Sequence, residues 1–111
     1  MREDRVYLQH IAECIRRIEE NTSKGREEFL QSHTLQDAVL RNLQTMSEAT
    51  QRLSEDRKNK YLQIEWSRIV AFRHVLVHNY LGIDLEIIWG ITQRDVPELK
   101  TAISAMLEEM P

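Results

Sequence analysis

Three side chains that can do chemistry on a phosphate lie within one short segment of the chain. Arg73 is followed after four residues by His78, and Tyr80 comes two residues later. An Arg can hold a phosphate in a bidentate grip, a His can take up or release a proton near neutral pH, and an exposed phenol can be modified. The residues around them are apolar, so these polar groups need either hydrogen-bond partners or a function.

Each of these residues also has an ordinary structural interpretation. Arg73 could form a salt bridge to a carboxylate on a neighbouring helix, with Glu48 as the candidate. His78 could be a core histidine bonded to a carbonyl, and Tyr80 a packed aromatic residue. The functional alternatives are a phosphate clamp for Arg73, general acid–base catalysis for His78 and a modifiable hydroxyl for Tyr80.

Helical geometry restricts how this segment could form one site. At about 100° per residue, Arg73 and Tyr80 share a face, whereas Arg73 and His78 lie roughly 140° apart. Two arrangements would let them converge: the helix unwinds near His78, or a dimer brings the Arg of one chain near the His of the other. We favour a site at or near a symmetric interface.

His74 and His78 have the i,i+4 spacing of a metal-binding pair. No Glu follows the first His, and Cys14 is the only cysteine, so the sequence offers no further metal ligands of the usual kind. We therefore predict no metal and no cofactor. The single cysteine also excludes an internal disulfide.

The elements that must position this segment are helices. The 111 residues include three glycines and two prolines, and helix-forming residues dominate. Apolar residues recur at spacings of three and four, which is typical of amphipathic helices. We predict one domain over residues 1–111, an all-α, up-and-down bundle of four to five helices. Its helices are expected at about 4–21, 34–53, 64–80, 85–92 and from 95 onward, with a short helical turn at 26–32.

Particular residues are expected to begin and end these helices. Thr34 should cap the second helix, and residues 54–60 should form a solvated helix end or loop. Gly82 is a plausible left-handed residue after the third helix, with Asp84 capping the next. Pro97 would stand in the first turn of the last helix. The third helix is apolar nearly all round, so it is either central or meets another subunit.

Composition narrows the class of protein. The net charge of −3 argues against a strongly basic protein that wraps nucleic acid, so any anion site must be local. The N-terminal residues lack the apolar stretch of a secretory signal, and no run is long enough to cross a membrane. A cytoplasmic protein is the expectation.

The segment and its flanks resemble the HepT-like toxin branch of the HEPN superfamily, whose signature is Arg-x4-His-x-Tyr. Residues 46–49 resemble the second-helix segment of that branch, and Trp66 precedes the motif as it often does there. Residues 80–84, Trp89 and residues 95–99 match the downstream pattern. The resemblance covers about residues 35 to 100. The chain departs from the pattern at His74, where Asn or Asp is common, and at Glu65, where Pro is common.

The resemblance implies a homodimer with paired motifs flanking a cleft. It also implies a metal-independent endoribonuclease toxin of a type VII-like toxin–antitoxin pair. Its antitoxin would be a minimal nucleotidyltransferase that adenylylates Tyr80. On this hypothesis Arg73 and His78 are catalytic on RNA, and His74, Asn79 and Glu48 are candidate supporting residues. The alternatives are a non-catalytic nucleotide-binding or regulatory subunit of a nucleotidyltransferase complex, and a purely structural helical dimer.

Overall fold

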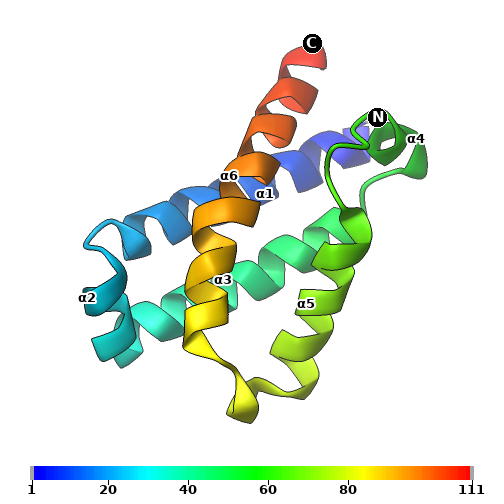
Figure 1. Ribbon diagram of the computed structural model, residues 1–111. Helices are drawn as coiled ribbons and strands as arrows, with labels where there is room; N and C mark the ends of the chain where they lie inside the picture. The colour runs from blue at the N-terminus through cyan, green and yellow to red at the C-terminus, as the bar shows by residue number, and fades with distance from the viewer. Residues whose placement is uncertain (1, 111) are drawn as a thin grey trace.

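The computed structural model describes residues 2–110, apart from the side chains of Arg2 and Tyr80. Within these residues every regular element is helical, in the order α1 (Arg2–Thr22), α2 (Arg26–Gln31), α3 (His33–Gln51), α4 (Glu55–Asn59), α5 (Trp66–His78), the 3₁₀ turn η1 (Tyr80–Gly82) and α6 (Leu85–Glu109). The prediction of an all-α bundle is confirmed, with six α-helices among the described residues where four to five were expected. Figure 1 shows α5 and α6 diverging from the η1 turn, with α1 and α3 passing behind α6.

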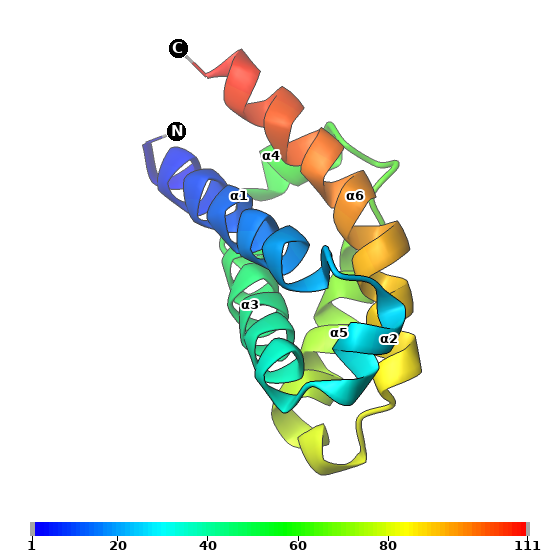
Figure 2. The same cartoon turned by 90° about the vertical axis from the view of Figure 1, so that its left-hand side faces the viewer.

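The first layer is the antiparallel pair α1 and α3, which lie side by side in both views (Figure 2). The apolar stripe of α1 is buried, as its spacing predicts: Leu8, Ile11, Ile15 and Ile18 are at most 2% exposed. On α3, Val39, Leu43 and Met46 recur at spacings of four and three and are buried opposite it. Burial of apolar residues at spacings of three and four is what holds such a pair together.

The second layer positions the motif segment. Helix α5 packs against α3, and α6 packs against α1 and α2. Ile69, Phe72 and Leu76 form the inner face of α5, and all three are buried. The opposite face is not covered within the chain, since Val70 is 49% and Val75 42% exposed.

Helix α6 corrects the predicted break between residues 92 and 95. It runs unbroken from Leu85 to Glu109 with Pro97 inside it. A proline inside a helix costs about 3 kcal/mol. The buried stripe continues through Ile91, Val96 and Leu99 without a phase shift, and its burial outweighs that cost. Asp95 is therefore a helical residue, 3.2 Å from the guanidinium of Arg68.

Several helix ends also differ from prediction. The N-cap of α3 is Ser32, whose hydroxyl accepts a hydrogen bond from the Leu35 N–H, and not Thr34. Among the described residues the one glycine with positive φ is Gly25, so Gly82 is not left-handed. Asp84 caps α6 as predicted, accepting from the Glu86 N–H at 2.9 Å. None of the described helices is both long and apolar enough to cross a membrane.

The charged stretch 54–60 is less solvated than predicted, because it forms α4 and anchors the start of α1. Asp4 is 3% exposed and accepts hydrogen bonds from the backbone and hydroxyl of Ser54 and from Arg57 Nε at 3.0 Å. Burial alone would raise the pKa of Asp4, but these hydrogen bonds outweigh it and lower the pKa. The network fixes α4 to α1 ahead of the loop that leads into α5.

Candidate functional site

The motif segment lies on α5 and the turn that follows it. The helix is regular through His78, and Asn79 forms its C-cap, where its N–H still donates to the Val75 carbonyl. The unwinding considered near His78, ahead of Gly82, therefore begins only after His78 and does not turn that side chain toward Arg73. The Asn79 carbonyl also accepts a hydrogen bond from the Gly82 N–H, 3.1 Å away, and this bond closes the turn that contains Tyr80. The Tyr80 side chain lies outside the described residues.

Arg73 points toward α3. Its Nη2 lies 3.4 Å from Glu48 Oε2, so the anticipated ion pair is present. The two side chains are 33% and 39% exposed, and at that exposure such a pair contributes roughly 0–1 kcal/mol. Arg73 Nε is buried without a hydrogen-bond partner among the described residues. Arg73 is therefore held at one end and still has donors available for a ligand.

A groove of about 380 Å³ continues along α3 and α5 beyond this ion pair. Leu40 and Gln44 line it from α3, and Leu76 and Val77 line it from the second half of α5. Arg41 contributes to its rim, and no ion pair involves Arg41 among the described residues. The groove is one helical turn from Arg73 and offers an open surface beside it.

His78 lies on the other side of α5 and is exposed. The interpretation of His78 as a buried core histidine is thereby contradicted. Its ring is next to that of His74, with the ring centroids 4.5 Å apart and the planes tilted by 44°. Within one chain the structure thus brings Arg73 to Glu48 and His74 to His78, but it does not bring Arg73 to His78.

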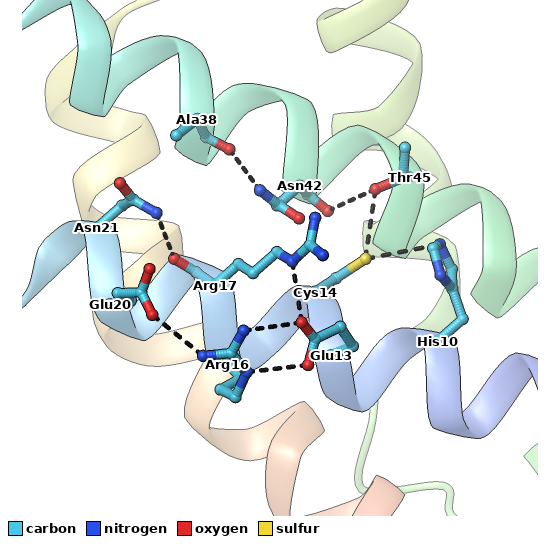
Figure 3. A network of polar contacts seen from close by, with 10 residues as sticks. All are labelled: His10, Glu13, Cys14, Arg16, Arg17, Glu20, Asn21, Ala38, Asn42 and Thr45. Carbon is cyan, nitrogen blue, oxygen red and sulfur yellow. Dashed lines mark hydrogen bonds and ion pairs between the residues drawn. The ribbon is translucent and has the colours of Figure 1, made fainter.

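Sequence reasoning missed a second polar cluster, which lies between α1 and α3 (Figure 3). The thiol of Cys14 is 3.3 Å from Thr45 Oγ1 and 3.6 Å from His10 Nε2. Burial raises the pKa of Cys14, so the sulfur is a protonated thiol and a poor nucleophile at neutral pH. No pattern in the sequence pairs Cys14 with Thr45, since they are 31 residues apart.

The exposed edge of that cluster is an ion-pair network along α1. Glu13 accepts hydrogen bonds from Arg16 and Arg17, which lower its pKa to about 2 (Figure 3). The spacings of three and four residues are the signal that could have predicted it. These are solvent-exposed pairs that stabilise α1 locally.

The chain is similar over nearly all its length to proteins named as ribonucleases. The "Ribonuclease HepT-like" family matches residues 11–106. A "Putative RNase" of Caldanaerobacter subterraneus is 31% identical over 98% of both chains, and a "Probable ribonuclease HepT" of Thermococcus cleftensis is 36% identical over 89% of this chain and 91% of its own.

A longer relative from Methanocaldococcus jannaschii is named "Gamma-glutamylcyclotransferase and putative RNase". It is 38% identical over 99% of this chain, which spans half of its length. No solved structure gives a significant match. The matches confirm the predicted family and the predicted class of enzyme: the chain belongs to the HepT-like ribonuclease family.

Proposed function

We propose that this protein is a metal-independent endoribonuclease toxin whose site is assembled from Arg73 and His78 of two chains. The observation that carries the proposal is the placement of these residues on α5. His78 is exposed, and Arg73 is one-third exposed beside an open groove, so neither is sealed inside the monomer. RNA cleavage needs one group that binds the phosphate and another for acid–base catalysis. In a member of a ribonuclease family, Arg73 and His78 are suited to these two roles.

The exposed face of α5 supports a homodimer. Val70 and Val75 are 49% and 42% exposed there, and Leu81 in the following turn is 91% exposed. His74 and His78 lie between the two valines on this face. A partly apolar face of this kind is suited to contact with a second copy. A two-fold axis along it would place the Arg73 side of one α5 near the His78 side of the other.

The proposed reaction is internal transesterification. His78 takes the proton of the 2′-hydroxyl, the 2′-oxygen attacks the adjacent phosphorus, and the bond from phosphorus to the 5′-oxygen breaks. An imidazolium returns a proton to the leaving 5′-oxygen, giving a 2′,3′-cyclic phosphate and a 5′-hydroxyl. Arg73 holds the phosphate and stabilises the charge that develops on it. RNA supplies its own nucleophile, so the chemistry requires no metal.

Control by a partner is the second part of the proposal. A minimal nucleotidyltransferase antitoxin would transfer AMP to Tyr80. Its backbone lies in η1, directly beyond the cap of α5 and two residues from His78. An AMP group there would add bulk and negative charge next to the site. Sterics and like-charge repulsion would both oppose binding of the RNA backbone.

Cleavage of RNA by the purified protein in EDTA tests the activity directly. We expect wild-type protein to cleave, and Arg73→Ala and His78→Ala to lose at least about 100-fold, as expected for loss of an acid–base group or an oxyanion ligand. His33→Ala, an exposed histidine at the start of α3, is the matched control and should cleave normally. Undiminished cleavage by both site variants would exclude this mechanism.

A further inference from the structure

His74 and His78 form a pair whose geometry has a use besides acid–base catalysis. Both rings are exposed on the outward face of α5, one turn apart, and their centroids are 4.5 Å apart. Among the described residues, neither ring takes part in a hydrogen bond or an ion pair. The rings are therefore free to turn about their last torsion angle.

The spacing of the two rings is that of a bidentate metal ligand. A nitrogen ligand lies about 2.0–2.1 Å from Zn²⁺, and a ring centre lies a little over 1 Å behind its nitrogen, so each centre would be about 3.2 Å from the ion. For ligand angles of about 90–109°, the two centres would then be about 4.5–5.2 Å apart. The observed 4.5 Å falls at the lower end of this range. Rotation of the two rings, without movement of the helix, would turn one nitrogen of each toward a shared ion.

The donor set selects the class of ion. Two imidazoles favour Zn²⁺, Ni²⁺ or Cu²⁺, whereas Mg²⁺ and Ca²⁺ prefer oxygen ligands. Among the described residues no group of three or more His, Cys, Asp or Glu could surround an ion. In a single chain, water would therefore fill the remaining positions. A site with two protein ligands is open and exchangeable, unlike the closed four-ligand site that would stabilise a fold.

We propose that His74 and His78 chelate a Zn²⁺-like transition-metal ion and that the ion inhibits the protein reversibly. The sequence argued against a metal because it lacks further ligands, but an inhibitory site does not need them. An imidazole nitrogen bound to an ion cannot accept a proton, so occupancy would remove His78 from acid–base catalysis. The chelation stands on the geometry of α5 alone, whereas the inhibition rests on the proposed function.

Calorimetric titration of tag-free protein with ZnCl₂ and NiCl₂ tests the chelation. Loss of even an outer-shell partner of a metal site costs about 10–100-fold in affinity, so His74→Ala and His78→Ala should each weaken binding at least about tenfold. His33→Ala should bind like the wild type, and MgCl₂ should give no heat of binding. Binding unchanged in His74→Ala and His78→Ala, or no binding to the wild type, would overturn the proposal.

A rival metal site is the contact between Cys14 and His10, since sulfur and nitrogen are also metal ligands. Cys14→Ser separates it from the α5 pair, because that variant should keep full affinity if His74 and His78 hold the ion. Zinc binding lost in Cys14→Ser but kept in His74→Ala would assign the ion to that contact and contradict our inference.

Inhibition by the ion is measured in a separate experiment. Rates of RNA cleavage with and without Zn²⁺ are compared as a ratio within each variant, so any effect of a substitution on the basal rate cancels. Wild type should lose most of its activity to Zn²⁺ and regain it in EDTA, while His74→Ala should keep its own metal-free rate. Equal inhibition of the two would refute the regulatory role. If no variant cleaves RNA, the proposed function fails and the titration still decides whether the metal site exists.

Discussion

Mixing two inactive variants, Arg73→Ala and His78→Ala, should restore RNA cleavage. The reason is the geometry of α5, which is regular from Trp66 to His78. Five residues at about 100° each place the two side chains roughly 140° apart around one helix. Arg73 is held on the α3 side by Glu48, 3.4 Å away, and His78 is exposed on the outer side. One chain therefore cannot present both groups to one phosphate.

The expected recovery follows from symmetry. In a two-fold dimer, each site would take its Arg73 from one chain and its His78 from the other. A dimer of the two variants would then have one site with both residues intact and one with neither. Random reassortment makes about half of the dimers mixed, each with one of two sites intact, so the mixture should reach about one quarter of wild-type activity.

The assay is cleavage of a labelled RNA in EDTA at fixed total protein. The variants are unfolded together in urea and refolded, so that their subunits exchange. The matched control pairs His78→Ala with the double variant, which can form no intact site. If native mass spectrometry shows mixed dimers and the mixture cleaves no faster than its parents, the site is not shared between chains and the geometric argument is wrong.

Three further perturbations test other parts of the structure. Val70→Asp should give a monomer by light scattering and abolish cleavage, whereas Val6→Asp, on the exposed side of α1, should do neither. Asp4→Asn should lower the free energy of unfolding by about 2–3 kcal/mol at pH 7, measured in urea, because Arg57 loses the nearer of its two carboxylate partners and keeps only Glu109, 3.8 Å away. Since the pKa of Asp4 is lowered below its usual 3.8, the wild type should keep this stability above that pH and lose it in stronger acid. The variant lacks the carboxylate and should show no such loss of stability in acid. Glu48→Gln should change stability by less than about 1 kcal/mol yet slow cleavage, because Arg73 loses the carboxylate that orients it.

The parts of the fold that the sequence predicts are those that depend on periodicity. The stripes of α1 and α3 are buried as their spacing indicates, because one continuous apolar face determines how a helix packs. The missed features depend on contacts distant in sequence. Asp4 and Arg57 are 53 residues apart, and no local pattern pairs them. Pro97 suggests the first turn of a new helix, and tertiary burial along α6 keeps the helix continuous through it.

The same distinction applies to the site. The spacing of Arg73 and His78 predicts that a single straight helix keeps them apart, and α5 does so. The sequence could not show which face of α5 is covered, because that helix is apolar nearly all round. The structure resolves this: the covered face carries Ile69, Phe72 and Leu76, and the histidines lie on the uncovered one.

The uncovered face of α5 links the fold to the chemistry. A helix that served only its own chain would tolerate Lys or Glu at the outward positions of Val70 and Val75, and solvent would favour them there. Instead, valines border the two histidines, and Arg73 emerges at the edge of the buried side. Contact with a second α5 would cover the valines and bring an Arg73 to each His78. Burial of this face and completion of the site would then be one event, so dimerisation would itself switch on the chemistry.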